Sequence, residues 1–171
     1  MELRVVQDWL MSEFNIEITN SFTITKDDLV KSGKSILYNK NVKTHLGNKE
    51  IQGVYIWSRI DNDEIIYVGM SGKLIWKDKT KTEVEPNSYN IQKRLVSSRG
   101  RHKVEGQTEK VELTTYRYLK EIVLKEEKIR NLKVSVFEVD TNKYSPTYIE
   151  SCILQEIFSK YRLIPKYNES F

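Results

Sequence analysis

The sequence predicts an α+β fold in which helices flank a small antiparallel or mixed β-sheet, made of a hairpin and a third strand. Two β-rich runs, near 52–60 and 64–69, are separated by Asp61-Asn62-Asp63, which is typical of a hairpin. Apolar and polar residues alternate over 132–139, which predicts a strand that is at least half buried. Elsewhere, apolar residues three to four positions apart predict helices.

The composition is that of a globular protein, with 39% hydrophobic and 30% charged residues. A chain of 171 residues suffices for one domain, or for one domain with an appendage. The formal net charge is only +4, but nine Lys or Arg and three Asp or Glu lie between Met70 and Lys103. Such a local excess of positive charge is typical of contact with a phosphate backbone. The alternative is a solvated charged loop.

The cysteine content indicates a reducing compartment. Cys152 is the single cysteine, which excludes an internal disulfide and a multi-cysteine zinc site. Its neighbours Ile149 and Ile153 favour a small core residue over a nucleophile. The N-terminus has no long apolar run, and no stretch is long enough to span a bilayer. We therefore expect a cytoplasmic protein with no membrane partner.

The first fifty residues are expected to form an N-terminal, helix-containing appendage, used for dimerisation or for DNA recognition. Residues 2–14 show the apolar spacing of an amphipathic helix. Extended or irregular structure is expected over 16–24, and Thr25 is a plausible N-cap of a short helix. Residues 36–50 are polar, and we expect them to be irregular.

The remaining residues, 51–171, are expected to form the main domain. Tyr55 and Tyr67 lie in the two hairpin strands, although their even spacing does not by itself place them on one face. A basic insertion over 70–87 follows, in which Trp76 lies among lysines. This composition suits either a loop laid along DNA or a surface loop packed on the core.

Three helices are expected after this insertion. The first, near 88–99, carries Arg94, and the second covers 109–130. The third starts at Ser145-Pro146, where serine is a favoured N-cap and proline a favoured first residue, and it extends to about Tyr161.

Five short motifs, in order along the chain, resemble those of the GIY-YIG nuclease family. The resemblance covers about residues 51–168, and the arginine helix is similar to that of the bacterial excision-repair incision subunit. Two positions depart from the family pattern, Met70 for a lysine and Ser98 for a histidine. The motifs are Gly53-Val54-Tyr55, Tyr67-Val68-Gly69, the helix around Arg94, Tyr148-Ile149-Glu150-Ser151, and Pro165 with Asn168.

The resemblance implies an active site for phosphodiester hydrolysis. Tyr55 would be the general base and Tyr67 its hydrogen-bonding neighbour, or the two roles would be exchanged. Arg94 would clamp the phosphate. Glu150 would hold one Mg²⁺ per active site, with Mn²⁺ as a substitute ion, and Glu156 is the alternative ligand by its spacing to Asn168. Further DNA or phosphate contacts are expected from Lys73, Lys77, Lys93, Arg99, Arg101, His102 and Asn168.

The function expected from these residues is that of a Mg²⁺-dependent DNA endonuclease. The small size favours a type II restriction endonuclease, acting as a homodimer on a short site in double-stranded DNA, with a cognate methyltransferase in the host. Two alternatives stay open at this point. One is a structure-specific repair nuclease, and the other is a DNA-binding protein of the same fold without catalysis.

Overall fold

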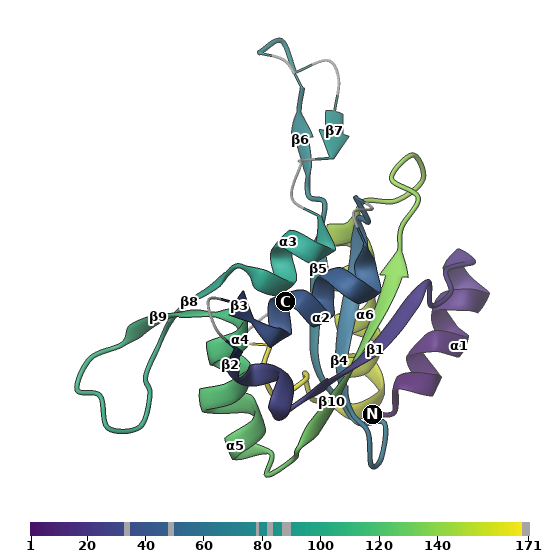
Figure 1. The fold of residues 1–171 in the computed structure, drawn as a ribbon. Coiled ribbons are helices and arrows are strands. Elements are labelled where there is room, and N and C mark those ends of the chain that lie inside the picture. The colour runs from purple at the N-terminus through teal and green to yellow at the C-terminus, as the bar shows by residue number, and fades with distance from the viewer. Residues whose placement is uncertain (33–34, 48–49, 78, 82–83, 87–89, 169–171) are drawn as a thin grey trace.

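A four-stranded antiparallel sheet, with strand order β1-β10-β4-β5, lies at the centre of the molecule (Figure 1). The computed structural model describes residues 1–171 except 33–34, 48–49, 78, 82–83, 87–89 and 169–171. The expected hairpin and third strand are confirmed. The four strands are β1 (Asn20–Thr25), β4 (Gly53–Arg59), β5 (Ile65–Ser71) and β10 (Asn131–Glu138).

Helices cover both faces of the sheet, so each face has its own hydrophobic core (Figure 1). One face packs against α1 (Leu3–Phe14) and α6 (Pro146–Tyr161), both close to their expected bounds. The Ser145 hydroxyl accepts a hydrogen bond from the N–H of Tyr148, as expected of an N-cap. The other face is covered by α2 (Leu37–Leu46), α3 (Ile91–Val96), α4 (Thr115–Tyr118), the π-helical η2 (Leu119–Val123) and α5 (Leu124–Glu126).

Strand pairing places the two motif tyrosines on the same face of the sheet. Tyr55 lies opposite Gly69, and Trp57 lies opposite Tyr67. Because side chains alternate between faces, these four positions share the face that is covered by α2 to α5. Val54 lies between them on the opposite face, against α1 and α6.

Residues 1–50 are part of the same fold and not an appendage to it. Strand β1 pairs with β10 through six residue pairs. Helix α1 completes one core, and α2 completes the other, where the Tyr38 hydroxyl donates a hydrogen bond to the Leu95 carbonyl of α3. The expected division near residue 50 therefore does not separate two cores.

Three expectations for secondary structure are wrong. Of the helix expected near 88–99, only Ile91–Val96 is helical among the described residues, because Ser98 and Arg99 belong to a strand. Residues 37–46 form a helix, because Tyr38, Val42 and Leu46 recur every four residues and are buried against the sheet. The helix expected over 109–130 is shorter. Its first residues form β9 (Val111–Thr114), which pairs with β8 (Ser98–His102), so the continuous helical segment begins at Thr115.

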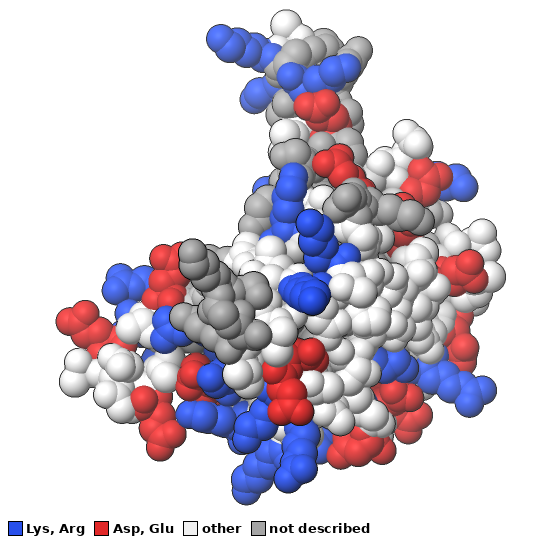
Figure 2. Space-filling view, in the orientation of Figure 1, with Lys and Arg blue, Asp and Glu red and all other residues white. Residues whose placement is uncertain are grey.

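Two hairpin arms extend from the body on either side of α3 in the chain (Figure 1). One is formed by β6 (Leu74–Trp76) and β7 (Val84–Pro86), within the expected basic insertion. Basic side chains gather at its end in the space-filling view (Figure 2). The other arm is formed by β8 and β9. Because Ile75 is 41% exposed, the first arm is not packed onto the core. The short elements η1 (Asp27–Leu29), β2 (Lys31–Ser32) and β3 (Ser35–Ile36) complete the description.

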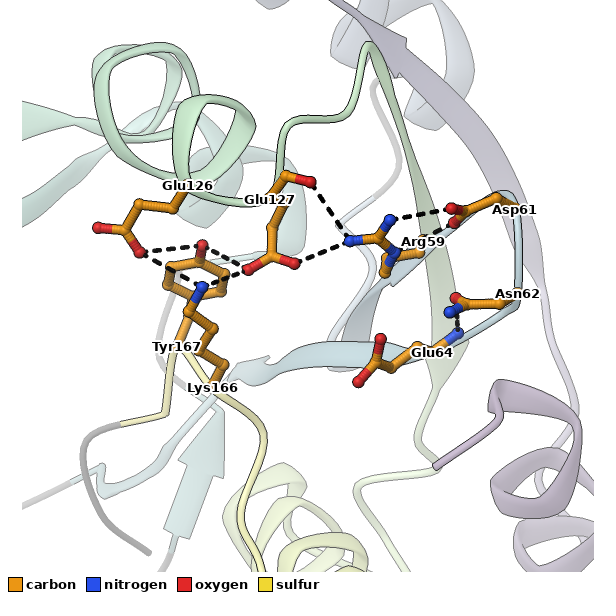
Figure 3. Close-up of polar contacts among 8 residues, drawn as sticks. All are labelled: Arg59, Asp61, Asn62, Glu64, Glu126, Glu127, Lys166 and Tyr167. Carbon is orange, nitrogen blue, oxygen red and sulfur yellow. Dashed lines mark hydrogen bonds and ion pairs between the residues drawn. The ribbon is translucent and has the colours of Figure 1, made fainter.

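An ion-pair network fastens the C-terminal segment to the sheet (Figure 3). Glu127, at the end of α5, accepts hydrogen bonds from Arg59 Nη1 at 3.0 Å, Lys166 Nζ at 2.6 Å and the Tyr167 hydroxyl at 2.9 Å. Arg59 also pairs with Asp61 at 2.9 Å. Three segments that are distant in the sequence are therefore held together by one carboxylate.

Within the described part of the chain, we find no helix that is both long enough and apolar enough to cross a bilayer.

Candidate active site

The two motif tyrosines form a buried pair around Gly69. Their ring centroids are 5.8 Å apart, and Tyr55 is 0% exposed while Tyr67 is 7% exposed. A Cβ at Gly69 would lie 2.6 Å from Cε1 of Tyr67 and 2.8 Å from Cζ of Tyr55. Position 69 therefore needs glycine because the two rings occupy the space of a side chain.

Arg99 of β8 is the direct partner of both phenols. Its Nη1 donates to the Tyr67 hydroxyl at 2.8 Å and to the Tyr55 hydroxyl at 3.4 Å. The guanidinium also lies against three aromatic rings, with centroid distances of 4.3 Å to Tyr67, 5.1 Å to Trp57 and 5.3 Å to Tyr118. Cation–π contacts of this kind hold a guanidinium in place away from solvent. Arg99 was expected on the DNA phosphates; in the structure it lies among the aromatic rings.

Arg94 of α3 lies near Tyr55, and its guanidinium has no hydrogen-bond partner among the described residues. Asn90 caps α3 by accepting a hydrogen bond from the N–H of Lys93 at 2.9 Å. Arg94 is close enough to Tyr55 and to Glu150 to lower the pKa of both. Its side chain forms no hydrogen bond or ion pair with any residue that the structure describes. It is therefore available to a ligand.

Glu150 lies close to Arg94 and Arg99, on α6, which packs on the opposite face of the sheet from the two tyrosines. Burial raises the pKa of its carboxyl to about 7, although Arg94 and Arg99 both act to lower it. Glu150 makes no hydrogen bond or ion pair among the described residues. Glu156, by contrast, is paired with Lys160 at 2.6 Å on the same helix. Of the two candidate ligands, Glu150 is the one near the arginines.

The environment of Tyr55 disfavours its ionised form. Burial is the main cause that raises the pKa of Tyr55 above its usual range, and the neighbouring Tyr67 adds to this. Arg99 and Arg94 oppose the shift. Deprotonation of a phenol here would depend on those two cations, and on any further positive charge that arrives with a ligand.

The remaining expected contacts divide into two groups. The Asn168 amide is engaged by β5, where its Oδ1 accepts from the Val68 N–H at 2.9 Å and its Nδ2 donates to the Val68 carbonyl at 2.8 Å. His102 Nε2 lies 2.9 Å from the Arg99 carbonyl oxygen, and its ring packs on Tyr118. Both residues are therefore partly buried and engaged by the protein itself. Exposed positions, by contrast, are occupied by Lys73, Lys77, Lys93 and Arg101.

Three aromatic residues of the site were not predicted from the sequence. Trp57 and Tyr118 supply rings to Arg99, and the pKa of the buried Tyr38 is raised by burial and lowered by Arg99. Trp57 could have been found, because it lies two residues after Tyr55 in a strand and therefore on the same face. Tyr118 gave no such signal.

The donor set suits a single hard cation bound through one carboxylate. No group of three or more His, Cys, Asp or Glu side chains that could hold a metal occurs among the described residues. Mg²⁺ typically uses one or two carboxylates and keeps several waters. The unpaired Glu150 carboxylate fits such an ion.

No protein-family model, curated protein or solved structure matches this chain.

Proposed function

We propose that the protein is a metal-dependent DNA endonuclease of the GIY-YIG type. The observation that carries the proposal is that Arg94 of α3 lies close both to Tyr55, which pairs with Tyr67 across β4 and β5, and to Glu150 of α6. These residue types are what phosphodiester hydrolysis needs, namely a proton acceptor, a phosphate clamp and a metal ligand. The two tyrosines belong to one hairpin, but α3 and α6 come from later in the chain, and strand packing alone gives no reason for Arg94 and Glu150 to lie near each other.

Each side chain has a role that follows from its contacts. One tyrosine of the pair, ionised to its phenolate, takes a proton from the attacking water, and the other tyrosine helps to orient that phenolate through Arg99, which both contact. Arg99 stabilises the phenolate, because its guanidinium already donates to both hydroxyls. Arg94, which lacks a protein partner among the described residues, binds the scissile phosphate with its planar fork.

Glu150 would hold Mg²⁺, with Mn²⁺ as a substitute. When bound, the ion supplies positive charge to the leaving 3′ oxygen. The Glu150 carboxylate must be ionised to bind a cation, and its pKa near 7 means that metal binding releases a proton at neutral pH.

The substrate that we propose is intact double-stranded DNA with a short specific site, as for a type II restriction endonuclease. A symmetric dimer would supply one active site per strand. Basic residues of the β6–β7 arm, such as Lys73 and Lys77, would contact the backbone. A cognate methyltransferase would then protect the host DNA.

Digestion of a mapped plasmid with Mg²⁺ tests this proposal. Discrete fragments are the expected result. Cleavage of flapped or nicked substrates alone would indicate a repair nuclease, and no hydrolysis of any substrate would leave only DNA binding.

Single substitutions test the assigned roles. We expect Glu150→Ala, Tyr55→Phe and Tyr67→Phe each to lower the cleavage rate by about 100-fold or more while DNA binding is nearly unchanged. Normal turnover by any of these variants would remove that residue from the mechanism. Arg99→Lys keeps the charge and loses the planar guanidinium whose Nη1 donates to both phenols, and Glu156→Gln on α6 serves as the matched control.

A further inference from the structure

A cavity of about 350 Å³ lies at the end of the α4–α5 helical segment that is distant from the tyrosines. Its lining includes five cationic side chains and two apolar ones, Leu124 and Ile129. The cations come from η2, from α5 and the turn after it, and from the end of β1. They are Lys26, Lys120, Lys125, Lys128 and Arg130, and we call this site the basic pocket.

The cations of the basic pocket are largely uncompensated. Lys125 pairs with Glu121 at 3.4 Å, whereas the other four form no ion pair with any residue that the structure describes. All five are exposed, and Leu124 beneath them is 7% exposed. Five like charges around one cavity repel one another, and a polyanion would relieve this repulsion. With the Lys125–Glu121 pair counted, the pocket still carries four uncompensated positive charges, as many as the net charge of the whole chain, which is +4.

The basic pocket is linked to the candidate active site through one continuous helical segment. Tyr118, which packs against Arg99, is followed directly by η2 and α5. At about 1.5 Å of rise per residue, Leu124 lies about 9 Å along the axis from Tyr118. That length corresponds to about three phosphates of one DNA strand, which advance by about 3.4 Å each. Basic side chains gather over the α5 region on the face seen in Figure 2.

We propose that the basic pocket binds the phosphate backbone of the DNA duplex that flanks the cleaved bond. This inference rests on the proposed nuclease function and adds a second anchoring site to it. The apolar floor gives the lysine stems a surface to lie on, while their ammonium groups contact phosphate oxygens. Contacts of this kind read no bases, so the basic pocket would contribute affinity and register but no sequence preference.

The test measures DNA binding as a function of salt. The Glu150→Ala variant serves as the parent, so that cleavage does not consume the duplex. In it, Lys120→Gln with Arg130→Gln removes two charges from the basic pocket. The control pair, Arg4→Gln with Lys143→Gln, removes two exposed charges from the side of the sheet that carries α1.

The pocket variant is expected to bind duplex about 10-fold or more weakly at low salt, and to reduce the slope of log Kd against log salt by about 1–2. The control pair should change the slope by much less. A slope equal to that of the parent would overturn the inference and leave the nuclease proposal standing. In that case, binding of poly-L-glutamate at the pocket would identify an acidic protein as its partner. A parent that binds no duplex would overturn both.

Discussion

Gly69 shows how a single residue sets the geometry of the candidate site. Its backbone lies under the rings of Tyr55 and Tyr67, with no room for a Cβ. The sequence indicated the tyrosines, Arg94 and Glu150 through short motifs at characteristic positions. It could not indicate Arg99 as their partner, because that contact depends on β8 turning back over the sheet after α3.

Gly69→Ala is expected to lower the free energy of unfolding by about 1–3 kcal/mol, as overpacking of a rigid cluster does. It should also displace the phenols from Arg99 and lower the cleavage rate. Denaturant unfolding measures the loss of stability, a spectroscopic titration of the tyrosines measures their displacement, and a cleavage assay measures the rate. Gly106→Ala is the control for cleavage only: a Cβ there meets no atom within 4 Å, but the φ of +81° strains any side chain and lowers stability by itself. Equal cleavage by both variants would contradict the packing argument.

Glu150→Gln is expected to change stability in a pH-dependent way. The folded state raises the pKa of Glu150 from 4.5 to about 7, so it binds more protons than the unfolded state between these values, and wild-type stability falls as pH rises through this window. Glutamine removes that loss. Each pKa unit is worth about 1.4 kcal/mol before solvent screening, which reduces the effect. We therefore expect the free energy of unfolding of the variant to exceed that of wild type by about 1–2 kcal/mol above pH 7.

Below pH 4.5 the Glu150→Gln variant and wild type should have the same stability, because the carboxyl is then protonated in both states. Thermal unfolding across pH 4–8 measures the difference. Glu156→Gln should show no gain above pH 7, because it loses an ion pair with Lys160. A gain for Glu150→Gln that does not depend on pH would contradict the assigned cause.

At the scale of elements, helix α3 matters most, because it presents Arg94. It is only six residues long, from Ile91 to Val96. A helix this short depends on its cap and its packing rather than on its own propensity. Asn90, which is 4% exposed, supplies the cap.

Asn90→Ala is expected to lower the free energy of unfolding by about 1 kcal/mol, the usual loss when an N-cap side chain is removed. Fraying of α3 should also weaken phosphate binding by Arg94, which raises the KM of cleavage. Asn90→Ser keeps an acceptor oxygen and should retain most of both properties. Chemical denaturation together with steady-state kinetics checks the pair. An alanine variant as stable as the serine variant would refute the role of the cap.

Elements with strong periodicity or strong caps were predictable, and elements defined by their partners were not. Helices α1 and α6, the hairpin and β10 follow from local pattern. Helix α2 was missed because its polar residues, such as Asn39 and Asn41, obscured a repeat of three buried side chains. Strand β9 was taken for a helix because its pairing with β8 is not visible in its own four residues.

At the scale of the whole molecule, long-range pairing decides the architecture. The contacts of β1 with β10 join residues more than one hundred positions apart, such as Asn20 and Val136. No local pattern predicts such a partner, which explains why residues 1–50 were expected to stand apart. The Glu127 network is a second long-range link, between β4, α5 and the C-terminal segment.

Glu127→Gln is expected to lower the free energy of unfolding at pH 7 by about 1–3 kcal/mol, because it weakens three charge-assisted or hydroxyl hydrogen bonds at a side chain that is 10% exposed. Burial alone would raise the pKa of Glu127, but Lys166, Tyr167 and Arg59 lower it overall. A lowered pKa stabilises the fold above the unfolded value of 4.5, and the contribution is lost as pH falls below it. Wild type and variant should therefore converge in acid.

Unfolding curves at pH 7 and at about pH 3, below the reference carboxyl pKa, measure this convergence. Glu126→Gln is the matched control, since its carboxylate is exposed and lies 3.6 Å from Lys166. It should change stability by only a few tenths of a kcal/mol. A loss at Glu127 that is as large in acid as at neutral pH would contradict an ionic origin.

The pair of hydrogen bonds that joins the Asn168 amide to the Val68 backbone has a consequence for self-association. Together with the Tyr167 N–H, which donates to the Ile66 carbonyl at 3.0 Å, it occupies backbone groups along the outer border of β5. A sheet border whose donors and acceptors are already taken is a poor template for docking another strand. Two copies of this chain would therefore have to meet through side chains, and not by extending one sheet into the next across β5.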